Sequence, residues 1–325
     1  MMRVEFDNAT AVKVAEYFES TGMATAAAKM WQGVSTSAPY DREAREKLGD
    51  LLFEQVQSGY PPGSVARSRL ILDVISQSLP TARLTDAYFE NLELLLANRP
   101  KRTRPGETIL GVGAGRCGST TLCAAVASVP GACAVHEIPP LIYWEPLADQ
   151  VRFHLDRLRL LADYYPIVFE VAHWWLNALD RFFAEFPGGK VIALHRNTES
   201  CVRSFLTVKG LGRGSLNHWA SPENKCWAPN LWDPTYPTYS VNAALLPDPD
   251  AAKAAMIERY VHEYNQTLRR LAECDPRVLL IRTEDLNSPA TIARLNSLVG
   301  LPVNMPRTVL NAGTTRDSDR RFYVF

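Results

Sequence analysis

The sequence predicts an α/β protein, in which helices flank a parallel sheet and an all-helical region precedes it. Beyond residue 105, short apolar runs alternate with amphipathic segments, and this pattern requires a parallel sheet covered on both faces. Before that point, apolar residues recur only at helical spacing. We therefore place a helical region at 1–105 and an α/β domain at 106–325, with the boundary in the basic segment KRTRPGE.

Five segments of the N-terminal region have the periodicity of amphipathic helices, and they are separated by Gly- and Pro-containing breaks. The five segments are 11–22, 25–34, 43–56, 64–79 and 85–98. Short helices joined by short turns predict helical hairpins, although the sequence has no 34-residue repeat. We expect this region either to cap the main domain or to bind a protein partner or gate the substrate site.

The α/β domain is expected to contain five strands and at least six helices. The expected strands are 108–113, 132–137, 166–173, 190–196 and 277–286, and the expected helices are 121–129, 146–165, 175–186, 198–208, 257–271 and 289–300. Ligands of such sheets bind at the carboxyl ends of the strands, so the residues there are the candidates for function. The segment 210–250 has too many Pro, Asn and Trp residues for long elements, and its aromatic residues either line a substrate pocket or pack the segment down.

The overall composition limits the classes of partner. The chain has 325 residues with 35 basic and 35 acidic side chains, so its formal charge gives no sign of nucleic acid or an anionic membrane surface as a partner. Six scattered cysteines lack the spacing of a metal site or a redox pair, which predicts no metal and a reducing, cytoplasmic compartment. No signal peptide and no apolar run of membrane-spanning length is found, so we expect no membrane partner.

The segment Thr108–Thr121, TILGVGAGRCGSTT, predicts a strand, a Gly-rich turn and a helix start, an arrangement that binds phosphate. A nucleoside triphosphatase loop needs Lys where this chain has Ser119, which disfavours that class. Gly113–Gly118 is also a literal GxGxxG, and Glu137 follows it at the distance of a ribose-binding acid. An oxidoreductase using NAD(P) is therefore an alternative.

Three segments, taken together, resemble sulfotransferases that use 3′-phosphoadenosine-5′-phosphosulfate (PAPS). The loop Arg116–Thr120, RCGST, resembles their 5′-phosphosulfate loop. Arg196 and Ser204, in the run FPGGKVIALHRNTESCVRS, resemble their 3′-phosphate motif, and LLIRTEDLNSPATIARLNSLVGLP resembles a later segment of the family. Loop and glutamate placement are closest to the protein-tyrosine sulfotransferases. The resemblance covers roughly residues 106–310 and implies the P-loop-like sulfotransferase fold.

The resemblance also implies which residues hold the donor. Its 5′ side would be held by Arg116, Cys117, Gly118, Ser119, Thr120 and Thr121, and its 3′-phosphate by Arg196 and Ser204. Arg316 or Arg320, in a basic C-terminal segment, is a further candidate for the 3′-phosphate. PAPS is the expected cofactor, its product is 3′-phosphoadenosine-5′-phosphate (PAP), and no metal is expected.

Transfer of a sulfonyl group to a hydroxyl or amine needs a general base. The resemblance implies Glu137, with His136 as the rival, and a third alternative is that neither acts. If the strand continued through both residues, their side chains would point to opposite sides. His173 stands where relatives carry a lysine that assists the leaving group, so it either has that role or packs on Trp174. We expect a small, ring-bearing acceptor, and a non-catalytic module that recruits a partner through residues 1–100 is the other alternative.

Overall fold

The computed structural model describes residues 8–37, 42–209, 249–300, 302–303 and 305. The expectations for the segment 210–248 and for Arg316 and Arg320 therefore lie outside the described residues. Contacts within the chain divide it into two compact units, one formed by residues 1–100 with 139–141 and the other by residues 101–138 with 142–325. The predicted boundary between residues 105 and 106 stays a prediction.

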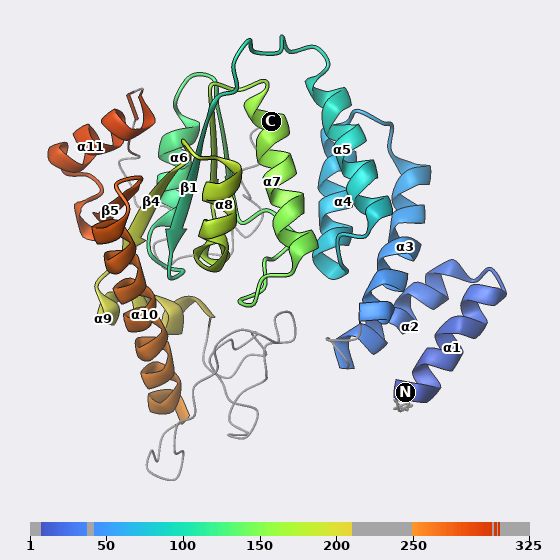
Figure 1. Cartoon of the computed structure of the whole chain (residues 1–325). Helices are drawn as coiled ribbons and strands as arrows, with labels where there is room; N and C mark the ends of the chain where they lie inside the picture. Colours follow the sequence, from blue (N-terminus) through green and yellow to red (C-terminus); the bar gives the residue numbers. More distant parts are fainter. Residues whose placement is uncertain (1–7, 38–41, 210–248, 301, 304, 306–325) are drawn as a thin grey trace. The chain divides into compact units, whose positions relative to one another are not determined.

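The first unit is built from five helices, α1 (Asn8–Ser20), α2 (Ala24–Ser37), α3 (Arg42–Gly59), α4 (Val65–Gln77) and α5 (Ala82–Leu96) (Figure 1). Two of them begin at side-chain caps, because Ser64 and Thr81 accept hydrogen bonds from the backbone N–H groups of Arg67 and Leu84. A core of small and large apolar side chains joins α1, α2 and α3 around the buried Trp31.

The second unit contains a sheet of five parallel strands, which confirms the predicted α/β class. The strands are β1 (Glu107–Gly113), β2 (Ala132–His136), β3 (Ile167–Val171), β4 (Lys190–His195) and β5 (Val278–Arg282), in the order β2-β3-β1-β4-β5 (Figure 1). Every pairing is parallel. The carboxyl ends of all five strands therefore lie at one edge of the sheet, and β1 is its central strand.

Helices cover both faces of the sheet, as the alternating pattern predicts. They are α6 (Ser119–Ala127), α7 (Ala148–Ala162), α8 (Leu179–Glu185), α9 (Thr198–Lys209), α10 (Pro249–Cys274) and α11 (Pro289–Val299). One apolar core packs α6 and α11 against side chains such as Phe169, Ile192 and Ile281. Alternation turns Glu170 to the opposite face, where it meets Arg157 of α7, and α10 lies along β4 and β5.

That opposite face contains a fully buried ionic cluster. Glu170, His154 and Arg157 each have an exposed fraction of 0%. Glu170 pairs with Arg157 and lies 2.9 Å from Nδ1 of His154. Burial by itself raises the pKa of Glu170, but the charges of Arg157 and His154 outweigh it and hold that pKa below its ordinary value. The cluster therefore joins α7 to β3 beneath the carboxyl edge of the sheet.

Three strand ends differ from the sequence-based expectation, and each difference concerns the carboxyl edge. The chain leaves β2 after His136, because Glu137 adopts a φ of 49° that no strand can contain. It leaves β3 at Val171 and forms a 3₁₀ turn, η1 (His173–Ala178), where a strand end and then a helix were expected. A second such turn, η4 (Thr283–Asp285), replaces the expected end of β5.

Candidate functional site

The turn between β1 and α6 has an unusual backbone, and its glycines are required by geometry. Gly118 has a φ of 88°, and a Cβ atom there would lie 3.0 Å from Cγ2 of Thr283. A Cβ atom on Gly113 would lie 2.8 Å from the carbonyl oxygen of Leu194. Arg116 has a φ of 54° without being a glycine. Non-glycine residues in this region of φ are uncommon, and they concentrate where function requires a particular geometry.

The same turn presents backbone donors to the carboxyl edge. The first N–H groups of a helix have no partner within the helix, and in α6 they belong to Ser119, Thr120 and Thr121. The preceding residue, Gly118, provides no side-chain cap for them. These backbone donors and the positive end of the helix dipole therefore point in one direction, an arrangement that binds anions.

Two arginines and a serine from distant parts of the sequence meet at this turn. Nε of Arg116 donates a hydrogen bond to Oγ of Ser204 over 3.2 Å, across 88 residues of sequence. Nη1 of Arg196 donates to the carbonyl oxygen of Arg116 over 2.7 Å. Burial lowers the pKa of the Arg116 guanidinium, and the neighbouring charge of Arg196 acts in the same direction. Two partly desolvated cations held side by side favour an anionic ligand.

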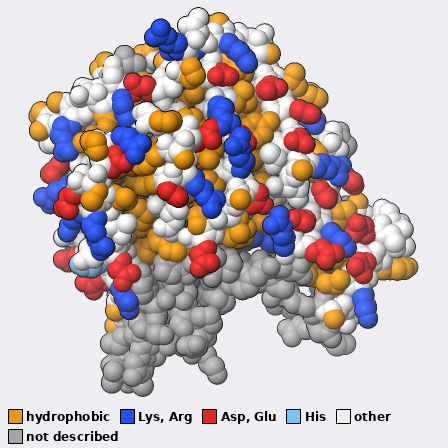
Figure 2. All heavy atoms as spheres, in the orientation of Figure 1, with side chains coloured by type: hydrophobic (Ala, Val, Ile, Leu, Met, Phe, Trp, Pro, Cys, Tyr) orange, Lys and Arg blue, Asp and Glu red, His pale blue; other side chains and the backbone are white. Residues whose placement is uncertain are grey.

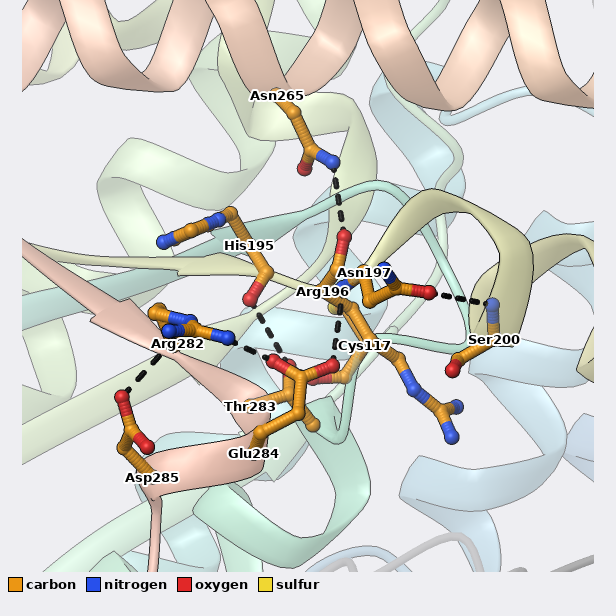
Figure 3. A network of polar contacts seen from close by, with 10 residues as sticks. All are labelled: Cys117, His195, Arg196, Asn197, Ser200, Asn265, Arg282, Thr283, Glu284 and Asp285. Atoms are coloured by element: carbon orange, nitrogen blue, oxygen red, sulfur yellow. Dashed lines mark hydrogen bonds and ion pairs between the residues drawn. The ribbon is translucent and has the colours of Figure 1, made fainter.

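A network of polar contacts holds Arg196 and the turn in place (Figure 3). The hydroxyl of Thr283 donates to the carbonyl oxygen of Cys117 over 2.5 Å and also lies 3.3 Å from that of His195. The amide of Asn265 donates to the carbonyl oxygen of Arg196 over 3.0 Å. In Figure 3 the guanidinium of Arg196 extends away from these contacts. The backbone on both sides of the arginine is therefore fixed, and its guanidinium reaches the carbonyl oxygen of Arg116.

Sequence reasoning missed the roles of Thr283 and Asn265. Thr283 lies in the segment LLIRTEDLNSPATIARLNSLVGLP, where no role was predicted for it, and its contact with Cys117 spans 166 residues. Asn265 lies within an amphipathic helix, where nothing in the local pattern separates it from a surface residue. Asn265 differs from a surface residue in being buried, with an exposed fraction of 5%, and burial depends on the tertiary structure.

Glu137 lies between two histidines at the carboxyl edge. Its two carboxylate oxygens lie 3.9 Å from Nδ1 of His136 and 3.5 Å from Nδ1 of His173. Its backbone N–H donates to the carbonyl oxygen of Val171 over 2.9 Å, which fixes the residue at the end of β3. The exposed fraction of the carboxylate side chain is 39%, against 19% and 17% for the two imidazoles. A carboxylate that is both exposed and flanked by imidazoles is suited to proton transfer.

The expectation that residues 136 and 137 face opposite sides does not apply. The alternation of side chains holds only within a strand, and β2 ends at His136. The φ of 49° at Glu137 then turns its side chain toward the imidazole of the preceding residue. The ring of His173 packs edge-on against that of Trp174, with ring centroids 5.0 Å apart, and the residue also lies near Glu137. Its role toward a leaving group stays a prediction.

The turn and the base cluster are connected through His136. Its Nε2 atom shares a hydrogen bond of 3.0 Å with Oγ of Ser119 and lies 3.5 Å from the hydroxyl of Thr120. The predicted anion-binding residues and the predicted base candidates thus form one continuous site. The hydroxyl of Tyr264 closes it from α10 by donating to the carbonyl oxygen of His173 over 2.7 Å.

Some candidate side chains are directed into the core instead. The thiol of Cys117 is buried, and burial raises its pKa to about 12, so only its backbone faces the turn. Thr121, in the first turn of α6, has an exposed fraction of 3%, so its side chain is buried as well. Cys201 is likewise buried, and its thiol lies 3.2 Å from the carbonyl oxygen of Gly115. The side chains of these residues pack against the buried side of the turn.

Several general features of the described residues bear on the site. No group of three or more His, Cys, Asp and Glu side chains in the described part of the chain is arranged to hold a metal ion. Within the same residues, no helix is both long and apolar enough to cross a membrane. Figure 2 shows acidic and basic side chains interspersed over the face in view. Any attraction for an anion must therefore come from local groups such as the two arginines.

Comparisons with known proteins give no family assignment. No protein-family model matches the chain, and no curated protein matches it in sequence. Among solved structures, it is similar to a sulfotransferase from Alicyclobacillus acidocaldarius, with a TM-score of 0.40 and 14% identity over 67% of this chain and 88% of that one. A likeness this distant supports no argument about function, so the proposals below depend on the residues themselves.

Proposed function

We propose that this protein is a sulfotransferase that moves a sulfonyl group from PAPS to a hydroxyl or amine of a small acceptor. One observation supports this above the others. Arg116 and Arg196 follow two separate strands, Ser204 lies in α9, and the three meet beside the N-terminus of α6. The turn with Arg116 is one anion-binding group, and Arg196 with Ser204 is a second one next to it. PAPS has two separate phosphate-type groups, so it matches such a site.

The donor set at the site fits this nucleotide. The N–H groups of Ser119, Thr120 and Thr121 at the start of α6, together with Arg116, would hold the 5′ side. Arg196 and the hydroxyl of Ser204 would hold the 3′-phosphate, because a guanidinium presents a planar fork of donors to phosphate oxygens. When bound, PAPS supplies a sulfonyl group whose S–O bond to phosphate breaks, with the electron pair going to the phosphate, as the bond to the acceptor forms.

Glu137 is the proposed general base. Its carboxylate accepts the proton that the acceptor hydroxyl or amine loses as it attacks. His136 and His173 flank the two oxygens, so either imidazole can share that proton afterwards. Arg116 is the residue proposed to stabilise the charge that develops on the leaving oxygen, since it belongs to the same turn as the backbone donors. These roles remain proposals for the residues that the sequence singled out.

Calorimetry with PAP tests the donor site. We expect wild-type protein to bind PAP, and Arg196→Ala to weaken binding by about 10- to 150-fold, because a hydrogen bond to a charged group contributes roughly 1.5–3 kcal/mol. Arg203→Ala is the matched control, since Arg203 is an exposed residue of α9 that pairs with Glu199. No binding of PAP, or equal binding by the two variants, would contradict the proposal.

The strand order disfavours the oxidoreductase alternative. In a dinucleotide-binding fold the acid that holds the ribose follows the strand next to β1. Here β3 lies between β1 and β2, so Glu137 follows a strand that is not adjacent to β1, the strand that leads into the Gly-rich turn. Tighter binding of NAD(P) than of PAP in the same titration would restore that alternative. Binding of PAP with no transfer to any hydroxyl or amine would favour a non-catalytic module.

A further inference from the structure

A small cavity lies beside the base cluster, lined by three different elements. Trp144 comes from the segment after β2, Leu176 and Asn177 from η1, and the remaining residues from one face of α10. Its volume is about 160 Å³. A cavity of roughly 10–15 Å³ on the same measure already holds one water molecule, so this cavity accommodates a group of a few heavy atoms.

The cavity adjoins the proposed general base through His173. Tyr264, which lines the cavity, donates its hydroxyl hydrogen bond to the carbonyl oxygen of His173, and His173 lies 3.5 Å from Glu137. Leu176 and Asn177 belong to the same 3₁₀ turn as His173. The wall of the cavity is therefore two contacts away from the carboxylate of Glu137.

Three aromatic rings form much of the wall. The ring centroids of Trp144, Tyr260 and Tyr264 are separated by 6.3 Å, 6.2 Å and 5.8 Å. The rings are mutually inclined by 57°, 49° and 60°, so they do not stack on one another as parallel plates. Aromatic faces carry partial negative charge and attract cations that lie within about 6 Å of the ring centre.

The charged group of the wall also favours a cation. Three side chains direct a donor to a backbone carbonyl group: Asn177 donates to Trp144, Thr267 to Glu263 and Tyr264 to His173. Those hydrogen atoms are engaged within the protein. The one charged side chain among the described residues of the lining is the carboxylate of Glu263, which also pairs with Arg259 at 2.9 Å. The described lining includes no lysine or arginine.

We propose that this cavity binds an alkylammonium group, and that the acceptor is an amino alcohol anchored there with its hydroxyl directed to Glu137. Binding of the cation follows from the aromatic wall and the carboxylate alone, whereas its identity as the acceptor rests on the proposed sulfonyl transfer. In that transfer the O–H bond of the alcohol breaks, its proton passes to Glu137, and an O–S bond forms as the S–O bond of PAPS breaks.

Two probes of equal shape and different charge test the cavity. Choline and 3,3-dimethyl-1-butanol differ in that a quaternary nitrogen replaces a quaternary carbon. Calorimetry on the full chain is expected to show choline binding at least about tenfold more tightly, as a desolvated cation–π contact predicts. Equal affinities, or tighter binding of the neutral alcohol or of phenol, would overturn the proposal.

Substitutions locate the binding. Trp144→Leu should weaken choline binding about tenfold, while Trp144→Phe should largely retain it. Glu263→Gln should weaken it several-fold, whereas Glu258→Gln, which removes the same charge from an exposed part of α10, should not. Unchanged affinity in both Trp144→Leu and Glu263→Gln would place choline elsewhere and refute the assignment. If Trp144→Leu does not fold, the comparison of choline with the neutral alcohol and the comparison of Glu263→Gln with Glu258→Gln still test the assignment.

Titration of PAP into the same samples separates this proposal from the proposed function. Choline binding without PAP binding would leave the cavity assignment standing and remove the transfer reaction. PAP binding without choline binding would remove the cavity assignment and leave the proposed transfer reaction standing. With both bound, formation of PAP from PAPS and choline, and not from the neutral alcohol, is the expected result.

Discussion

Two groups of charged side chains lie against the same sheet. One is buried between β3 and α7, and the other lies at the carboxyl edge. The inner group, His154, Arg157 and Glu170, has an exposed fraction of zero, and its ion pairs are formed within the group. The edge group pairs Glu137 with His136 and His173, and the exposed fraction of its carboxylate is 39%.

The difference between the two groups shows how burial separates structural charges from those available to a ligand. A buried ion pair has already lost its water, so removing one partner leaves a charge that nothing can solvate. A half-exposed carboxylate retains water that a substrate can displace, and its loss leaves no buried charge behind. We therefore expect substitutions in the inner group to affect stability and those at the edge to affect ligands and turnover.

The largest expected effect is on turnover at the edge. Glu137→Gln should lower the rate of sulfonyl transfer about a hundredfold to ten thousandfold, because the amide cannot accept the acceptor proton. The free energy of unfolding and the affinity for PAP should stay close to those of the wild type. Measurement of PAP formed from PAPS checks the rate, and Glu145→Gln, an exposed acid of the following segment, is the control. An unchanged rate in Glu137→Gln would show that another group is the base.

The inner group should give the largest loss of stability. Glu170→Ala leaves Arg157 charged and buried, and we expect the free energy of unfolding to fall by about 3–5 kcal/mol in urea titrations. Glu107→Gln removes a carboxylate of the same sheet whose pair with Lys190 is partly exposed, so its loss should stay below about 1 kcal/mol. Similar losses from both variants would remove the distinction between buried and exposed pairs.

The dependence of stability on pH should reveal the inner group as well. The pKa of Glu170 in the folded protein lies below its ordinary value of 4.5, because Arg157 and His154 outweigh the effect of burial. Its contribution to stability is therefore complete above the pKa of the unfolded chain and is lost as the pH falls through the folded pKa. Between about pH 5 and about pH 3, wild type should lose more free energy of unfolding than Glu170→Gln does. Parallel pH profiles would contradict this assignment.

The smallest effect concerns the contact that joins the two anion-binding groups. Ser204→Ala removes the acceptor of the Arg116 Nε hydrogen bond, and we expect the affinity for PAP to fall about threefold to tenfold. Thr207→Ala serves as the control, because that hydroxyl of α9 is exposed and donates to the carbonyl oxygen of Arg203. Calorimetry distinguishes the two, and equal affinities would show that Ser204 does not orient the arginine for the ligand.

The parts of the site that could be predicted from the sequence are those with local signals. The Gly-rich turn, Arg116 within it, and Arg196 at the end of a buried strand all follow from short patterns of residues. The contacts of Thr283 with Cys117 and of Asn265 with Arg196 could not be predicted, because they join residues far apart in sequence. The backbone turns at Glu137, and this turn brings the residue close to His136 and His173. The periodicity of the sequence does not predict such a turn.

The sequence by itself determined the class of fold and the residues from which an anion site is built. Alternation of apolar runs with amphipathic helices permits few architectures, and a glycine-rich turn between a strand and a helix is a local geometry. The tertiary structure alone decided that β3 separates β1 from β2, which brings two histidines to one carboxylate and disfavours a dinucleotide fold. Strand order is set by which apolar faces pack together, and that depends on contacts between residues distant in the chain.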